Sequence, residues 1–161
     1  MISSHIGKSK PEFRKPIPDN IPQELKTASQ WVVWNGHPDE EQSGGRWRKV
    51  AIDARTGGIA SMEDSKTWAD FETAYKAYQT GRYDGIGIVL TEGLSLCVFD
   101  FGPCAKAGEL APEVRQIIEQ LKTYCEYTAT GRIQALAIGR KPEVHELSSN
   151  GYMVYDSPRF V

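Results

Sequence analysis

One carboxylate stands out because of its surroundings. Asp100 ends the apolar run 96–99 and is followed by Phe101 and the turn residues Gly102-Pro103. Burying a carboxylate costs free energy unless a partner compensates its charge. Two interpretations of Asp100 stay open from the residues alone. In the first it is a metal ligand or a general base, and in the second it caps the following turn or pairs with a lysine or arginine.

A second group of residues suits a different chemistry. Arg46, Trp47, Arg48 and Lys49 follow one another in a predicted strand. Because side chains alternate along a strand, the two arginines share one face, and Trp47 and Lys49 share the other. Cations that contact phosphates, together with a tryptophan that stacks on a base, suit single-stranded DNA. The alternative interpretation is an ordinary charged surface with a half-buried tryptophan.

Two helices and about six strands, in the order ββαββαββ, have to position these residues. The predicted strands lie near residues 30–34, 46–52, 85–90, 96–101, 133–138 and 152–155. We expect the first two strands to pair as a hairpin. Asp64 or Ser65 caps the first helix, Gly81 ends it, and the second helix opens at Pro112. The apolar face of the second helix consists of Val114, Ile117, Ile118 and Leu121.

An aromatic stripe marks the first predicted helix. Trp68, Phe71, Tyr75 and Tyr78 recur at steps of three and four, which places them on one helical face. Such a row could serve as a platform for stacked bases. At helical spacing it more often packs into the core, and we expect the core role here.

Length and composition indicate one globular domain. The chain has 161 residues, of which 40% are hydrophobic and 25% charged. With 19 basic and 21 acidic residues the net charge is −2, so any nucleic-acid contact has to come from a local patch. Residues 1–22 are predicted to form a flexible, Pro-rich, basic tail, which is either solvated or contacts phosphate. The folded domain is expected over residues 23–161.

Cysteine usage and hydropathy favour a cytoplasmic protein. Cys97, Cys104 and Cys125 show no paired spacing, which is typical of reduced thiols. The N-terminus lacks the apolar run of a signal peptide. No stretch of the sequence has the apolar length that is needed to cross a membrane, so no membrane partner is expected.

Four stretches together resemble the primase-polymerase domain of phage and plasmid replication proteins, a branch of the archaeo-eukaryotic primase superfamily. The order and spacing of these stretches, rather than any one of them, carry the resemblance, which runs from about residue 21 to the C-terminus. They cover residues 22–25 with 30–34, residues 49–57, residues 65–78 with 83–90, and residues 155–160. The resemblance implies an α+β, primase-type fold with a mostly antiparallel sheet in two lobes and flanking helices.

The chemistry that the resemblance implies needs several carboxylates. An Asp-x-Asp pair on one strand and an acidic residue on a later strand hold divalent metals, while a Ser-x-His segment contacts nucleotide phosphates. Asp100 matches the first aspartate, but the second falls on Gly102. The expected histidine falls on Ala135 and the later acid on Met153. Asp100 alone could hold at most one weakly bound Mg²⁺ or Mn²⁺, and no cofactor is certain.

Three residues could stand in for the missing groups. Glu126 and Asp156 are acidic and near the right segments, although Asp156 should point to the sheet face opposite Tyr155. His145 lies in the loop before the last predicted strand. The residues expected to contact nucleic acid or nucleotide are Arg46, Trp47, Arg48, Lys49, Thr130, Arg132 and Arg159.

The leading hypothesis is a degenerate primase-polymerase-like domain of a mobile genetic element. It would be catalytically silent and would bind single-stranded DNA or a nucleotide in DNA replication. One alternative is a protein-binding inhibitor or decoy that acts on host replication or defence proteins, with a host or phage protein as partner. The near-neutral charge suits that alternative. Another is an active DNA primase or polymerase with a rearranged site.

Overall fold

The first sheet is built around a long hairpin. The computed structural model describes residues 9–39, 47–102, 105–106, 109–128, 132–140, 152–156 and 159–161. The strands of this sheet are, in spatial order, β10 (Arg159–Phe160), β3 (Gly85–Leu90), β1 (Trp31–Pro38) and β2 (Trp47–Ile52). All three pairings are antiparallel. The predicted hairpin of the first two strands is confirmed.

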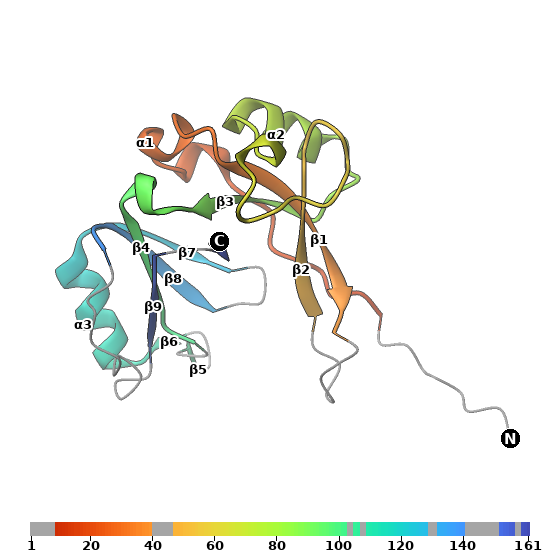
Figure 1. Ribbon diagram of the computed structural model, residues 1–161. Helices are drawn as coiled ribbons and strands as arrows, with labels where there is room; N and C mark the ends of the chain where they lie inside the picture. The colour runs from red at the N-terminus through yellow and green to blue at the C-terminus, as the bar shows by residue number, and fades with distance from the viewer. Residues whose placement is uncertain are drawn as a thin grey trace, which may run out of the picture.

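The second sheet is also antiparallel and lies beside the first (Figure 1). Its strands are, in spatial order, β7 (Tyr124–Tyr127), β8 (Ile133–Ile138), β4 (Leu96–Asp100) and β9 (Met153–Tyr155). A small ladder joins β5 (Ala105–Lys106) to β6 (Glu109–Leu110). The expected α+β class, with mostly antiparallel sheet in two lobes and flanking helices, is therefore confirmed.

Helices cover both sheets. Besides α1 (Gln23–Lys26), the main helices are α2 (Phe71–Gln79) on the first sheet and α3 (Pro112–Leu121) on the second, with single 3₁₀ turns at Pro18–Asn20, Ser65–Thr67 and Glu92–Leu94. As predicted, α3 opens with a proline and turns its apolar side to Phe101 and Ile133. No helix among the described residues is long and apolar enough to cross a membrane.

One buried cluster joins the two sheets. Val33 and Ile88 of the first sheet, Val98 and Leu136 of the second, and Phe71 of α2 all belong to it. The chain passes from β3 to β4, builds the second sheet, and returns to add β10 to the edge of the first. The two lobes therefore form around a shared core.

The predicted start of the first long helix is wrong. Asp64 caps only a 3₁₀ turn, and α2 begins after Asp70, whose side chain accepts a hydrogen bond from the Thr73 N–H at 2.7 Å. The cause is tertiary, because Ala69 exchanges two 2.8 Å backbone hydrogen bonds with Trp31 and so remains extended. Trp68 consequently packs in a separate buried cluster. The core role expected for the stripe is confirmed, because Trp68 and Phe71 are buried in core clusters and Tyr75 and Tyr78 pack partly buried against the cluster of Phe71.

The described part of the predicted tail, residues 9–22, contacts the folded body. Lys10 forms an ion pair with Asp84, and the ring of Phe13 packs edge-on against Trp34. Phe13 makes this contact because an aromatic ring in a polar run gains free energy by leaving water. Most of the other described residues of the segment are exposed, and its role as a flexible tail stays a prediction. The boundary at residue 22 itself stays a prediction.

Candidate functional site

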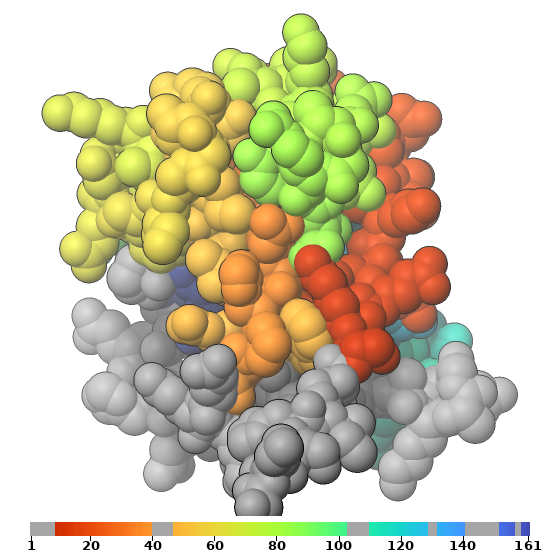
Figure 2. Space-filling view, turned by 90° about the vertical axis from the view of Figure 1, so that its right-hand side faces the viewer, coloured from red at the N-terminus to blue at the C-terminus, as the bar shows by residue number. Residues whose placement is uncertain are grey.

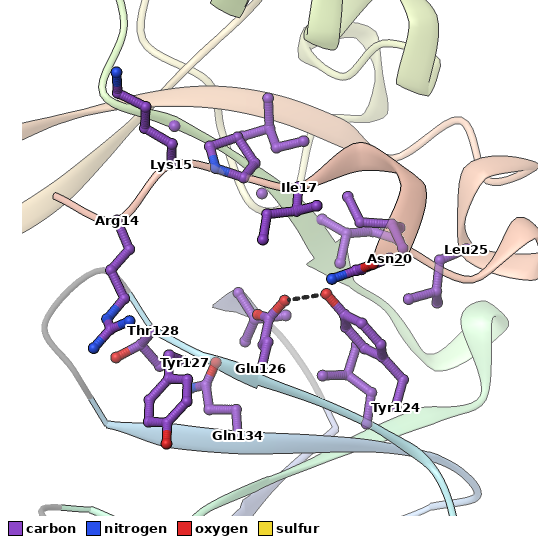
Figure 3. A pocket seen from close by; sticks show the side chains of 18 of the residues that line it. Arg14, Lys15, Ile17, Asn20, Leu25, Tyr124, Glu126, Tyr127, Thr128 and Gln134 are labelled. Atoms are coloured by element: carbon purple, nitrogen blue, oxygen red, sulfur yellow. Dashed lines mark hydrogen bonds between the residues drawn. The ribbon is translucent and has the colours of Figure 1, made fainter. Parts of the chain in front are cut away.

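A cavity of about 440 Å³ lies between the two sheets (Figure 3). Its walls come from the N-terminal segment, from β1, β2 and β3 of the first sheet, and from β7 and β8 of the second. The residues that bring polar or aromatic groups to it include Arg14, Asn20, Trp34, Lys49, Tyr124, Glu126, Tyr127 and Gln134. A cavity of this size, apolar with a few convergent polar groups, is typical of a small-ligand site.

One row of side chains crosses the second sheet. Strand register pairs Glu126 with Gln134, Gln134 with Asp100, and Asp100 with Met153. Residues directly opposite each other on neighbouring strands point to the same face. Glu126 and Gln134 line the cavity, and Asp100 and Met153 continue the row across the sheet. The row thus holds two carboxylates with an amide between them.

Asp100 is buried and fully engaged. Only 7% of its surface is exposed. Its Oδ1 accepts hydrogen bonds from the Gly102 N–H at 3.0 Å and from Arg132 Nε at 3.0 Å, while Arg132 Nη2 lies 2.8 Å away in an ion pair. Its Oδ2 faces the Gln134 amide at 3.4 Å. Asp100 therefore both caps the turn that follows β4 and pairs with an arginine, as the second interpretation expected.

Arg132 competes with a divalent metal at Asp100. An ion bound at Oδ1 would have to displace Arg132 from that oxygen, and charge-assisted hydrogen bonds are the strong ones. Among the described residues there is no group of three or more His, Cys, Asp or Glu that could hold a metal ion. The expected histidine position, Ala135, is fully buried against the α3 side of the sheet, and its neighbour Gln134 lies beside Asp100 instead.

Lys49 and Glu126 bring opposite charges to the cavity from different sheets. Burial lowers the pKa of Lys49, and the negative charges of Glu126 and Asp100 oppose that shift. Burial likewise raises the pKa of Glu126, whose carboxylate accepts a 2.8 Å hydrogen bond from the Tyr124 hydroxyl (Figure 3). No ion pair joins Lys49 to Glu126 among the side chains that the structure describes. Each charge is therefore incompletely compensated.

Aromatic rings support the cations around the cavity. The Lys49 amine lies 5.4 Å from the centre of the Trp34 ring and 5.2 Å from that of Phe160. The Arg14 guanidinium lies 4.6 Å from the centre of the Tyr127 ring. Such contacts hold a cation in place while leaving its hydrogen-bond donors free for a ligand. In Figure 3 the Arg14 side chain points toward Tyr127 and Thr128.

A second, open hollow of about 430 Å³ shares the lining residue Lys49 with the cavity. It is lined by Lys49, Ala51, Ala60, Met62, Arg159 and Phe160. The Arg159 guanidinium lies 3.7 Å from the centre of the Tyr155 ring. Lys49 therefore stands at the junction of two hollows, with Arg14 bordering one and Arg159 the other.

The structure brings together only part of the predicted binding set. Lys49 and Arg159 line the second cavity, whereas Arg132 is held by Asp100. The predicted alternation places Arg48 on the face opposite Lys49, and its side chain is exposed there. Trp47 packs near Phe13, with ring centres 6.4 Å apart. Arg46 and Thr130 lie outside the described residues, as does His145.

Sequence reasoning missed several groups that line the cavity. Tyr124 and Gln134 were not singled out, and Arg14 was assigned to the tail. A period-two pattern in Tyr124–Tyr127 was the available signal, because it puts Tyr124 and Glu126 on one face of a short strand. Of the residues considered as stand-ins, Glu126 reaches the cavity and Asp156 directly follows β9.

The fold and the site together define an α+β protein with a partly buried, cation-bearing cavity between two antiparallel sheets. No family model and no curated protein matches the chain.

Proposed function

We propose that this chain is a primase-polymerase-like domain that binds a nucleotide or single-stranded DNA without polymerising it. The observation that carries the proposal is the pair Arg14 and Lys49, which border one cavity beside aromatic rings. Within the described part of the chain neither residue has an ion-pair partner. The resemblance of the sequence to primase-polymerase domains supplies the ligand class.

Phosphate is the ligand group that this arrangement favours. Burial lowers the pKa of Lys49 because its charge lacks full compensation, and a phosphate bound next to it would supply the missing negative charge. Tyr127 lines the cavity and is 48% exposed, so its ring is the one on which a base can stack. The Gln134 amide and the Asn20 side chain offer both donors and acceptors to the polar edge of a base or sugar.

The state of Asp100 supports binding without polymerisation. Metal-assisted phosphoryl transfer uses several convergent carboxylates to hold ions beside the substrate phosphates. In this chain Asp100 forms an ion pair with Arg132. Gly102 and Met153 occupy the positions where the resemblance expects two further acids. The nearest other carboxylate of the row, Glu126, belongs to a strand on the far side of β8.

Fluorescence anisotropy with labelled oligothymidine, and with a labelled deoxynucleoside triphosphate, tests the proposal across a salt series. Lys49→Gln should weaken binding by about tenfold or more, since a hydrogen bond to a charged group contributes about 1.5–3 kcal/mol. It should also reduce the salt slope by about one phosphate contact. Arg48→Gln is the matched control, because it removes the same charge from the adjacent, opposite-facing position.

Three outcomes would contradict the proposal. Wild-type protein that binds neither probe at low salt would refute a nucleotide or DNA ligand. Equal losses in Lys49→Gln and Arg48→Gln would indicate non-specific surface attraction rather than the cavity. Primer extension in Mn²⁺ by the wild-type protein, abolished by Asp100→Ala, would refute the absence of polymerisation.

A further inference from the structure

Residues 10–17, here called the strap, lie against the first sheet (Figure 2). Four of them, Arg14 to Ile17, line the cavity between the lobes. The strap begins at an ion pair in which Lys10 Nζ lies 2.6 Å from Asp84 Oδ2. The same carboxylate oxygen accepts a hydrogen bond from the Gly36 N–H at 2.7 Å. Asp84 thus ties the start of the strap directly to the backbone of β1.

A notch over Gly36 receives the ring of Phe13. The ring packs edge-on against Trp34, with centres 5.2 Å apart, and also meets Trp47. A Cβ atom added at Gly36 would overlap the end of the Phe13 ring. Gly36 lies within β1 and is not one of the glycines with positive φ, so no turn explains the glycine. The space that it leaves is filled by Phe13.

The residue after Phe13 crosses to the other lobe. Arg14 reaches Tyr127 of β7, and its guanidinium lies 4.6 Å from the centre of that ring. Arg14 makes no ion pair among the described residues, and it borders the cavity (Figure 3). The position of Phe13 on the first sheet therefore determines the position of the Arg14 guanidinium relative to the second sheet.

We propose that the strap is a working part of the binding site, which rests on the proposed function above. Phe13 is a positioning residue: its ring, docked over Gly36, holds Arg14 where the guanidinium binds a phosphate of the ligand. A guanidinium held in one place loses less conformational entropy on binding than a free one, so docking raises affinity without a contact of its own. The affinity of the site then depends on a segment that contacts both sheets, through Phe13 on the first and Arg14 on the second.

A double-mutant cycle in the anisotropy assay tests this role. Phe13→Ala and Arg14→Gln should each weaken binding of the labelled oligothymidine or nucleotide by about tenfold. The double variant should lose little more than either single variant, because both changes remove the same phosphate contact. All three should show the same reduced salt slope. Arg82→Gln is the matched control, since Arg82 is an exposed arginine over a tyrosine ring that lines neither described cavity.

Gly36→Ala tests the notch without touching the strap. The added methyl group should displace the Phe13 ring, so Gly36→Ala should show the same affinity and salt slope as Phe13→Ala. A second readout needs no ligand: trypsin should cut after Arg14 faster in both variants than in wild type. Arg14 is the efficient trypsin site within the strap, because Lys10 and Lys15 each precede a proline. Circular dichroism confirms that each variant is folded.

The outcomes separate the two proposals. If wild-type protein binds neither probe, the proposed function fails and the role of the strap in binding fails with it. If wild-type protein binds but Phe13→Ala keeps its affinity and salt slope, the strap proposal alone is refuted. Losses in Phe13→Ala and Arg14→Gln that add in the double variant would also refute it, since they would show that Phe13 acts independently of Arg14.

Discussion

The ion pair between Asp100 and Arg132 should stabilise the fold rather than serve chemistry. A double-mutant cycle with Asp100→Asn and Arg132→Gln measures their coupling free energy. Arg132→Gln alone should be the more damaging change, because it leaves a buried carboxylate with only the Gly102 N–H and the Gln134 amide. Removing one partner of a buried pair leaves the other charge uncompensated.

The contacts set the expected magnitude. Arg132 brings two donors to Asp100 Oδ1, at 3.0 Å and 2.8 Å. The Asp100 side chain is 9% exposed and that of Arg132 is 37% exposed, so solvent screens the pair on the arginine side. We expect a coupling of about 2 kcal/mol, and a loss of about 3 kcal/mol for Arg132→Gln alone. That loss should lower Tm by about 6–12 °C in a domain of this size.

Urea unfolding of the wild type, the two single variants and the double variant gives the coupling directly. A coupling below about 0.5 kcal/mol would show that the pair contributes no more than an exposed one, and the structural role of Asp100 would be refuted. The structural role of Asp100 would also be refuted if Mg²⁺ or Mn²⁺ raised the Tm of wild-type protein but not that of Asp100→Asn. Asp100 would then be a metal ligand that exchanges Arg132 for an ion.

Two further predictions concern the walls of the cavity. Gly85→Ala should lower the free energy of unfolding by about 2 kcal/mol, because the new Cβ would lie 2.5 Å from the Trp34 ring. The control Gly58→Ala, whose Cβ would have its nearest neighbour at 3.4 Å, should change the free energy of unfolding by under about 0.5 kcal/mol. Equal losses in the two variants would contradict the overlap at Trp34. Burial raises the pKa of Glu126 above its ordinary 4.5, so wild-type protein should lose stability relative to Glu126→Gln as pH rises from 4.5 through the raised value. Urea unfolding measures the free energy of unfolding of both proteins, and a difference that stays constant over this pH window would contradict that burial.

Much of the fold follows from short-range patterns in the sequence. The hairpin of β1 and β2 was predictable because each strand is β-branched and aromatic and a polar, Gly-containing loop joins them. The helix α3 was predictable because Pro112 opens it and its apolar residues recur at helical spacing. The start of α2 was not, since backbone hydrogen bonds between Ala69 and Trp31 override the local preference.

The candidate site was less predictable, because it depends on which strands are neighbours. Alternation within β2 was enough to separate Lys49 from Arg48. Only strand register shows that Gln134 stands between Glu126 and Asp100, and register between distant strands is not visible in one sequence. The docking of Phe13 was hidden for a similar reason: its receptor is the space above a glycine in a distant strand.

The backbone around Gly102, where the resemblance would place a second aspartate, is organised around Asp100. Gly102 is buried and adopts φ +61, a left-handed conformation that glycine takes without strain and that costs other residues about 1–2 kcal/mol. Its N–H donates to the one carboxylate that remains, Asp100. A second aspartate at this position would bring a second buried charge into a turn that Asp100 already caps. The turn after β4 is therefore organised around Asp100 as its cap, and this agrees with our proposal that the chain binds its ligand without metal-assisted transfer.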